Sequence, residues 1–513
     1  MSRKGMNRRE AFLKTAQTAG WAAALGLTPA QSGAAVADGQ IYRRIGARPF
    51  INLTATYTIN GGALTRPEVK QAMEEASHWP MNLDELMEKV GERLSHLLGS
   101  EAAMVSAGAA AALVHGTAGV ITGGDPEKMQ QLPDLRGLKS EVIVPKASRN
   151  VYDHAIRSVG VKMVEIETAQ DLERSLTGKT AMIAVLGTGE AKSAVRLEQL
   201  VEAGRRLNVP VMVDAAAELP FNPNPYLKRG AALVAYSGGK FLRGPQCAGL
   251  LIGRKDLVQA AWLNSSPHHA FGRSMKVGKE EIMGMLAAIE VWRNNYDLEG
   301  EYKRWEGWFE EIIAKLKPLG LKTEIAPPLG ASPFPVLNLA WDKERYGLTA
   351  GEIGRMLLDG EPRIMSHAEG EVHEFRIRPV AMKPGEAAIV GKRLEEIFRK
   401  APKGKPEAAP AAPAADVSGA WALEIQFVAG ATKHRLELKA SANKVSGMHE
   451  GRITQGQMQG SIDGDKVRLR SSLPYEGTRL SYEFRGKLRG NQMSGEVSLG
   501  EYGKASWTAR RSG

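Results

Sequence analysis

Between residues 46 and 293 the chain alternates short apolar runs with longer segments of helical periodicity, and this alternation limits the possible folds more than any other feature. Such an order predicts an α/β domain in which crossover helices cover a mostly parallel sheet. Runs of this length also occur as short core helices, but their β-branched content and flanking Gly, Pro and Asn favour strands. The runs that we interpret as buried strands are residues 141–144, 181–186, 209–214, 231–236 and 247–253.

Two of these strands end in chemically useful residues: the run 209–214 ends in Asp214, and the run 231–236 is followed by Ser237-Gly-Gly-Lys240. Ligands of open α/β sheets bind beyond the carboxyl ends of the strands, so both side chains are expected at one crevice. A lysine that forms an imine and a carboxylate against the pyridine nitrogen are what pyridoxal phosphate (PLP) needs. Alone, a strand-end Asp is more often a helix cap and such a Lys more often part of a surface loop.

The small residues of the segment 105–111, including Ser106, Ala107 and Gly108, precede or open a helix. Backbone N–H groups can approach a phosphate there, and a helix N-terminus favours negative charge. Close packing of a helix on the sheet is the alternative reading. The phosphate cup, the pyridine partner Asp214 and the lysine Lys240 nevertheless follow one another in an order that suits one PLP molecule.

A smaller α/β unit is expected after the large domain. The spacing of Ile282, Met285, Leu286 and Ile289 predicts a helix over residues 279–292, interpreted as the long helix that leads out of the large domain. Beyond it we expect strands over 336–341 and 374–378 and helices over 350–358 and 386–399.

Residues 403–415 are rich in Pro and Ala, lack large apolar side chains and are typical of a semi-extended linker. From Trp421 to Arg510, alternating runs separated by glycine turns predict an all-β barrel or sandwich of roughly six to eight strands. The expected units are a signal peptide (1–37), a large domain (41–295), a small domain (296–400), a linker (401–415) and an accessory β domain (416–513).

The N-terminus has the pattern of an export signal. Arg8-Arg9 with the following residues 10–14 resembles a twin-arginine signal, a mildly apolar stretch follows, and small residues before position 38 suit cleavage. A basic amphipathic N-terminus is the alternative. The interpretation predicts a periplasmic or otherwise exported protein that travels folded with its cofactor.

Composition excludes several classes of protein. Cys247 is the only cysteine, which rules out an intrachain disulfide or a cysteine cluster for a metal. Much of the formal charge of +11 falls in the N-terminal and C-terminal segments, so the middle lacks a basic footprint for nucleic acid. No apolar run outside the N-terminus is long enough to cross a bilayer.

Several segments in order resemble the selenocysteine synthase-like family of PLP enzymes, which includes L-seryl-tRNA selenium transferase and the D-glucosaminate-6-phosphate ammonia-lyase branch. The resembling segments are residues 50–58 with Gly61-Gly62, 106–111, 152–157, 237–246 and 272–280. The resemblance implies a fold-type-I PLP enzyme with a large and a small domain, acting as a homo-oligomer with shared active sites.

The resemblance also assigns roles to residues. It implies the imine on Lys240 and the pyridinium contact on Asp214. It implies phosphate contacts at Ser106, Ala107, Gly108 and Ser237, and anionic substrate groups held by Arg273, Lys276 and Lys279. A solvated helix start is the alternative for these three cations.

One departure concerns Ser148, which stands where relatives commonly have His before Arg, so the residue over the cofactor ring is left open, with His154 as a weak substitute. A signal peptide stands in place of a tRNA-binding extension, which argues against a tRNA substrate. We expect an amino-acid or amino-sugar lyase that abstracts an α-proton and eliminates a β-substituent from a small anionic amino compound. An aminotransferase and a noncatalytic exported binding protein are the alternatives.

The phrase Ser237-x-x-Lys240 also matches the nucleophile motif of penicillin-binding proteins and class A β-lactamases. The Ser-Asp-Asn and Lys-Thr-Gly motifs of those enzymes are absent from the sequence. This interpretation is therefore disfavoured.

Overall fold

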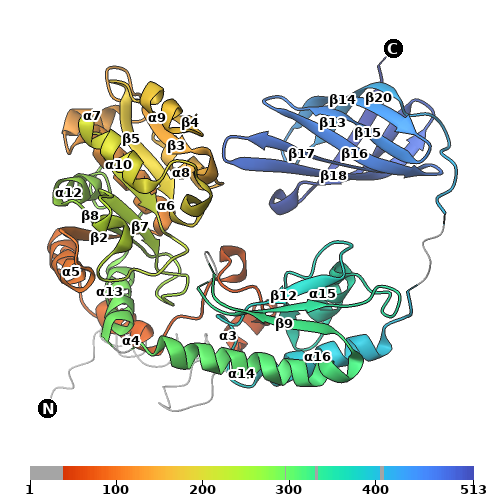
Figure 1. The fold of residues 1–513 in the computed structure, drawn as a ribbon, viewed down its shortest axis with the longest axis horizontal. Helices are drawn as coiled ribbons and strands as arrows, with labels where there is room; N and C mark the ends of the chain where they lie inside the picture. Colours follow the sequence, from red (N-terminus) through yellow and green to blue (C-terminus); the bar gives the residue numbers. More distant parts are fainter. Residues whose placement is uncertain (1–38, 295, 330–332, 405–408, 513) are drawn as a thin grey trace, which may run out of the picture.

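The computed structural model describes residues 39–294, 296–329, 333–404 and 409–512, which fold around three hydrophobic cores (Figure 1). One core belongs to a large α/β domain, the second to a small α/β domain and the third to a β-barrel. The predicted export signal lies outside the described residues. None of the helices in these ranges is long and apolar enough to cross a membrane.

The large domain is built on a seven-stranded sheet with the strand order β2-β8-β7-β6-β5-β3-β4. β8 runs antiparallel to both of its neighbours, and the other pairs are parallel. All five runs predicted as strands overlap strands of this sheet. The strands are β2 (Ala102–Ser106), β3 (Glu141–Pro145), β4 (Lys162–Ile166), β5 (Thr180–Leu186), β6 (Val211–Asp214), β7 (Leu233–Ser237) and β8 (Gly249–Gly253).

Helices cover this sheet, and α6 is the most completely buried of the longer ones. A β-carbon at Gly119 of α6 would lie 2.7 Å from the backbone nitrogen of Ala261, so the absence of a side chain lets α6 approach α12 closely. The helices are α4 (Pro67–Ser77), α5 (Leu83–Leu98), α6 (Ala109–Thr122), α7 (Pro126–Gln131), α8 (Asp153–Ser158), α9 (Ala169–Ser175), α10 (Leu197–Arg206), α11 (Pro225–Lys228), α12 (Lys255–Leu263) and α13 (Lys279–Asn294), with the 3-10 turns η1 (Thr58–Asn60), η2 (Lys146–Ser148) and η3 (Gly187–Lys192).

The helix that leads out of the large domain is α14 (Leu298–Leu316), so the interpretation of residues 279–292 in that role was wrong. The helix predicted there exists as α13, but it packs against α4 and α5, and its buried residues belong to the large core. In α14, Trp305 lies in the large core whereas Phe309 and Ile312 lie in the small core. One continuous helix therefore connects the two domains (Figure 1).

The small domain has a three-stranded antiparallel sheet, in the order β12-β10-β9, and a two-stranded parallel sheet of β1 and β11. Assigning residues 50–53 to the large domain was wrong, because β1 pairs with β11 and Ile51 and Leu53 are buried in the small core. The elements are α3 (Gln40–Arg43), β1 (Phe50–Asn52), η4 (Lys317–Leu319), β9 (Lys322–Ala326), β10 (Val336–Ala340), α15 (Ala350–Asp359), β11 (Arg363–Met365), β12 (Glu374–Ile377) and α16 (Glu386–Lys400).

The C-terminal β domain is a closed barrel in which eight consecutive strands pair antiparallel and β20 closes on β13. The strands are β13 (Gly419–Gln426), β14 (Ala431–Ser441), β15 (Lys444–Glu450), β16 (Gln455–Asp463), β17 (Lys466–Tyr475), β18 (Thr478–Arg489), β19 (Gln492–Ser498) and β20 (Lys504–Arg511), with η5 (Gly500–Tyr502) before the last strand. Of the two predicted architectures, the barrel is therefore the one that forms.

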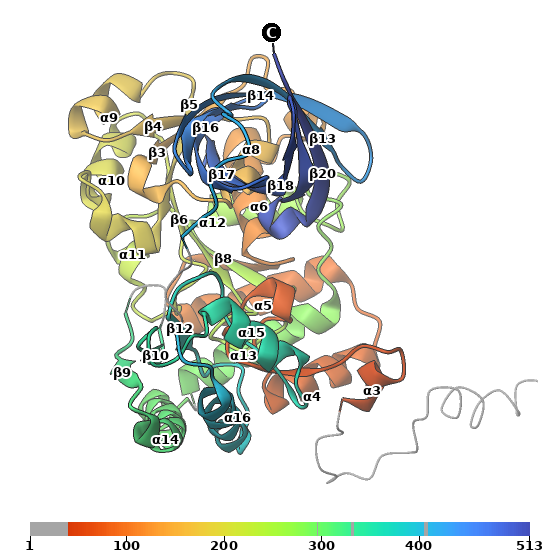
Figure 2. The ribbon, with the colours of Figure 1, turned by 90° about the vertical axis from the view of Figure 1, so that its right-hand side faces the viewer.

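Because the strands alternate in direction, the turns after β13, β15, β17 and β19 lie at one end of the barrel, which we call the hairpin pole (residues 427–430, 451–454, 476–477 and 499–503). The linker enters at the opposite end. Figures 1 and 2 both place β17 and β18 beside α8 of the large domain, so the hairpin pole faces the large domain.

The barrel interior contains a short chain of polar side chains. His434 Nδ1 lies 2.8 Å from His449 Nε2, and His449 Nδ1 lies 2.7 Å from Ser471 Oγ. Burial, with a smaller contribution from the neighbouring His434, lowers the pKa of His449 to about 3. Burial also lowers the pKa of His434, so both rings favour the neutral form.

Candidate active site

Asp214 and Lys240 meet at the carboxyl edge of the sheet because β6 and β7 are adjacent and parallel. Asp214 ends β6 and is 8% exposed, and one of its oxygens accepts a hydrogen bond of 3.0 Å from the backbone N–H of Ala216. Burial raises the pKa of Asp214 and lowers the pKa of Lys240. Each shift is opposed by the charge of the other residue, so the two groups lie close enough to interact.

The loop that carries Lys240 is held tightly by backbone hydrogen bonds. Gly238 N–H donates to the carbonyl of Ala248 at 2.8 Å, and Arg243 N–H donates to the carbonyl of Lys240 at 3.0 Å. A β-carbon at Gly239 would lie 2.8 Å from the Cα of Gln246, so only glycine fits this close approach. The glycines next to Lys240 thus position the side chain.

The predicted phosphate-binding residues gather at the same edge. Ser106 and Ser237 both pair with Gly249 of the intervening strand β8, one from each side. The Ser106 hydroxyl donates to the carbonyl of Gly108 at 2.9 Å. Gly108 has a φ of 95°, caps the N-terminus of α6, and has no atom within 4 Å of the position of a β-carbon. Beside Ala107, open space therefore adjoins the positive end of a 14-residue helix.

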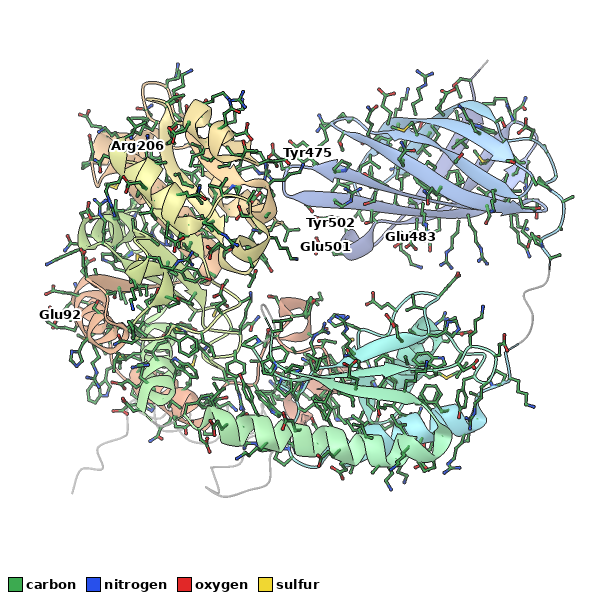
Figure 3. All side chains as sticks on the ribbon, viewed as in Figure 1. Glu92, Arg206, Tyr475, Glu483, Glu501 and Tyr502 are labelled. Atoms are coloured by element: carbon green, nitrogen blue, oxygen red, sulfur yellow. The ribbon has the colours of Figure 1, made fainter. Side chains whose placement is uncertain are left out.

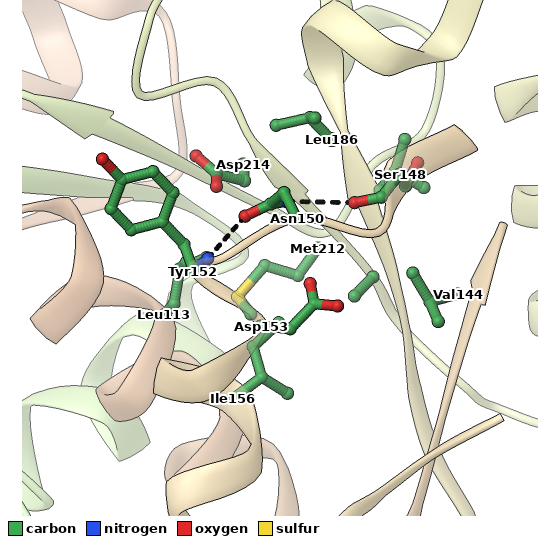
Figure 4. Close-up of a pocket in the computed structure, with 12 residues that line it drawn as sticks. Leu113, Val144, Ser148, Asn150, Tyr152, Asp153, Ile156, Leu186, Met212 and Asp214 are labelled. Atoms are coloured by element: carbon green, nitrogen blue, oxygen red, sulfur yellow. Dashed lines mark hydrogen bonds between the residues drawn. The ribbon is translucent and has the colours of Figure 1, made fainter. Parts of the chain in front are cut away.

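Tyr152 is the aromatic residue that the structure places next to Lys240. Lys240 Nζ lies 6.0 Å from the centroid of its ring. Burial raises the pKa of the Tyr152 phenol, and the charge of Asp214 raises it further. Figure 4 shows Tyr152 and Asp214 lining one small pocket with Ser148 and Asn150. His154, the substitute considered from the sequence, is exposed on α8.

A second residue that the sequence did not single out is Arg378, at the end of the predicted strand 374–378. Its backbone N–H donates to the carbonyl of Leu53 at 3.0 Å, and its Nη1 is buried without a hydrogen-bond partner among the described residues. Burial lowers the pKa of Arg378, and the neighbouring Tyr57 raises it. Tyr57 also raises the pKa of Tyr152, so Tyr57 is a neighbour of both Arg378 and Tyr152.

The contacts of the three cations assigned to substrate are with residues outside this cluster. Arg273 donates to the hydroxyl of Ser266 at 3.4 Å, Lys279 pairs with Glu280, and Lys276 is exposed. Within the described ranges, none of them forms a hydrogen bond or ion pair with Lys240 or Asp214.

Comparisons with known proteins agree with this geometry. The sequence pattern of the family described as SelA, L-seryl-tRNA selenium transferase, matches residues 51–301. A 5'-C-glycyluridine monooxygenase-decarboxylase from Streptomyces is 30% identical, covering 70% of this chain and 92% of its own length. The chain belongs to the L-seryl-tRNA selenium transferase family.

A D-glucosaminate-6-phosphate ammonia lyase from Salmonella typhimurium is 28% identical, over 70% of this chain and 98% of its own. A solved structure of D-glucosaminate-6-phosphate ammonia-lyase has a TM-score of 0.61 and 27% identity, and also covers 70% of this chain and 98% of the solved one. These findings confirm the predicted family, the fold-type-I architecture and the class of PLP-dependent enzyme.

The residues of the site fit PLP. The buried carboxylate of Asp214 has a single backbone donor and is available to a protonated ring nitrogen, Lys240 is a half-buried amine beside it, and Gly108 leaves space at a helix N-terminus. Along this edge Lys240 would bind the aldehyde of PLP, Asp214 its pyridine nitrogen and the N-terminus of α6 its phosphate.

Proposed function

We propose that this chain is a PLP-dependent lyase that abstracts the α-proton of a small anionic amino compound and eliminates its β-substituent. The observation that carries the proposal is the interacting pair of Asp214 and Lys240 on adjacent strand ends. The relative from Salmonella is an ammonia lyase, which supports elimination.

Each residue at the sheet edge has a separate task in holding the cofactor. Lys240 Nζ would attach it, Asp214 would keep its ring nitrogen protonated, and the phosphate would lie at Ser106, Ala107, Gly108 and Ser237. Once bound, PLP supplies an electron-withdrawing ring that stabilises negative charge on the substrate Cα.

Lys240 is also the proposed base. Its pKa is lowered by burial, so the neutral amine that accepts a proton is more populated than for an exposed lysine. A positioned base of this kind contributes about 10²–10⁴-fold to a proton transfer. The tight loop around Lys240 orients Nζ for this step.

Arg378 is the best-placed candidate for the anionic group of the substrate. Its Nη1 donor has no partner in the described structure, and a guanidinium binds a carboxylate or phosphate with two parallel hydrogen bonds. Arg273, Lys276 and Lys279 are the second candidates. They precede or begin α13, and they would contact a substrate only if this loop lies beside another active site, such as the active site of a second copy of the chain.

A homo-oligomer with shared sites is part of the proposal. Exposed apolar side chains cluster in two stretches of the sequence, at residues 41–59 and 151–152, and such a surface is typical of a subunit interface. The exposed residues are Ile41, Tyr42, Ile45, Tyr57, Ile59, Val151 and Tyr152. Export through the twin-arginine route also stays a proposal, based on Arg8 and Arg9.

The test is product analysis with PLP-loaded protein and a panel of amino acids and phosphorylated amino sugars. Release of ammonia together with a keto product is expected. Reversible amino transfer to a 2-oxo acid without an eliminated product would refute the proposal and indicate an aminotransferase. A cofactor-loaded protein with no turnover or spectral change across the panel would favour the binding-protein alternative.

A further inference from the structure

The tip of the β17–β18 hairpin docks on the loop of residues 148–153, which leads into α8 (Figures 1 and 2). Arg149 Nη2 donates to Glu476 Oε2 at 2.6 Å. The guanidinium of Arg157 lies 6.0 Å from the centroid of the Tyr475 ring, and Figure 3 shows Tyr475 where the barrel meets the large domain. Residues more than 300 positions apart thus form one contact.

Gly477 allows the hairpin to approach its partner at backbone distance. A β-carbon at this position would lie 2.0 Å from the carbonyl oxygen of Asn150 and 2.5 Å from Asp153 Oδ2. Its φ lies outside the range that favours glycine, so the requirement for glycine here comes from the neighbouring loop rather than from its own backbone.

The loop under the hairpin carries Tyr152. Arg149 Nε donates to Asp153 at 2.5 Å, and this carboxylate is only 4% exposed. The Oδ1 of Asn150 accepts a hydrogen bond of 2.7 Å from the backbone N–H of Tyr152 (Figure 4). A shift of Arg149 or Asn150 would therefore move the ring of Tyr152 relative to Lys240.

The Arg149–Glu476 ion pair is sheltered, which distinguishes it from an ordinary surface pair. The side chain of Arg149 is 12% exposed, and that of Glu476 is 33% exposed. A second contact between the barrel and the rest of the chain, Arg468 to Glu371, spans 3.8 Å with side chains that are 68% and 85% exposed. Solvent strongly screens the exposed Arg468–Glu371 pair, so this pair contributes little to docking. We therefore attribute the ordering of the loop of residues 148–153 to the contact with the β17–β18 hairpin.

The hairpin pole also presents η5 toward the same region. The charge of Glu501 in η5 is among the causes that raise the pKa of Tyr152. Figure 3 shows Glu501 and Tyr502 on the underside of the barrel.

We propose that the hairpin pole of the barrel is a wall of the active site of its own chain, and that Glu476 and Gly477 are positioning residues that hold Tyr152 beside the cofactor. The inference rests on the proposed function for the role of Tyr152. The docking itself is independent of any chemistry, which allows the two to be tested separately.

The experiment uses the full chain and four variants: Glu476→Gln removes the charge of the ion pair, Glu476→Asp keeps it, Gly477→Ala inserts a β-carbon, and Glu483→Gln is the control. Glu483 is an exposed carboxylate on β18 that does not take part in the docking contact. Hydrogen exchange of the peptide that covers residues 148–153 is measured in the cofactor-free protein, and PLP binding is then titrated by absorbance.

Exchange of this peptide should rise at least about fivefold in Glu476→Gln and Gly477→Ala, and the PLP dissociation constant should rise about tenfold, as for loss of one charged hydrogen bond. Glu476→Asp should recover part of both effects, and Glu483→Gln should match the parent protein. Unchanged exchange in both Glu476→Gln and Gly477→Ala, or an equal rise in Glu483→Gln, would overturn the inference. If the parent protein binds no PLP, the proposed function fails while the exchange result still decides the docking.

Discussion

Lys240 Nζ lies 6.0 Å from the centroid of the Tyr152 ring, and the carboxylate of Asp214 affects the pKa of both side chains. Three residues from three different strand ends or loops therefore surround one small volume. A flat ring bound between Lys240 and Asp214 would have Tyr152 as its aromatic neighbour.

Tyr152→Ala should weaken PLP binding up to about tenfold, because an aromatic pair contributes about 0.5–1.5 kcal/mol beyond the area that it buries. Tyr152→Phe keeps the ring and should bind PLP as the parent protein does. Absorbance titration of the cofactor-free protein measures both. Equal affinities in Tyr152→Ala and the parent protein would show that another residue covers the ring.

Lys240→Ala should abolish covalent attachment of PLP, because no other described lysine shares its place beside Asp214. Borohydride reduction followed by peptide mapping measures attachment directly. Lys276→Ala, in the exposed basic stretch, is a matched control and should be labelled at Lys240 as usual. A pyridoxyl adduct on a different lysine of the parent protein would contradict the assignment.

Arg378→Ala should raise the KM for an anionic substrate about 10- to 100-fold, as expected for loss of a charged hydrogen bond, with a smaller change in kcat. Arg376→Ala is the control, because Arg376 is an exposed arginine on β12, two residues before Arg378. Lys276→Ala tests the other candidate in the same assay. A larger rise in KM for Lys276→Ala than for Arg378→Ala would assign the anion to the basic stretch.

Acid should destabilise the barrel through His449. The folded-state pKa of His449 is lowered from an ordinary 6.5 to about 3. Between these two pH values His449 is therefore protonated in the unfolded chain and neutral in the folded chain. The contribution to stability is complete above pH 6.5 and is lost as the pH falls from 6.5 toward 3. His449→Gln should reduce the pH dependence of the unfolding free energy in this window by about 1.4 kcal/mol per pH unit.

Denaturant unfolding at several pH values between 7.5 and 4.5 measures this slope. His96→Gln, which removes an exposed histidine from α5, should leave the slope as it is. The same slope in His449→Gln and the parent protein would mean that His449 is not held neutral by the fold.

Replacing Arg8-Arg9 with Lys-Lys should retain the protein in the cytoplasm if the twin-arginine interpretation is right. Fractionation with an antibody against the barrel measures the distribution. Continued processing after Ala37 would instead indicate the general secretory route.

The sequence carried enough information to predict the sheet and its two chemical residues, because Asp214 ends and Lys240 follows an apolar run whose β-branched content and flanking residues favour a buried strand over a short core helix. Tyr152 and Arg378 were missed since their roles depend on how loops and domains meet. The assignment of residues 50–53 failed for the same reason: β1 pairs with a strand about 310 positions later. The apolar stripe of Phe309, Ile312 and Leu316 in α14 was visible in the sequence and was overlooked.

The seam between β13 and β20 makes the barrel suitable for circular permutation. Trp421 pairs with Arg511, the N–H of Ser512 donates to the carbonyl of Ala420 at 2.8 Å, and Arg511 Nη1 donates to the carbonyl of Ser418 at 2.5 Å. The two ends of the barrel are therefore close enough for a short peptide to join them, and new ends could be opened at an exposed turn. A permuted barrel would keep every strand pair, but the linker to the small domain would join it at another turn. Comparing docking in the permuted and parent proteins would separate the effect of the covalent linker from the effect of the contact surface.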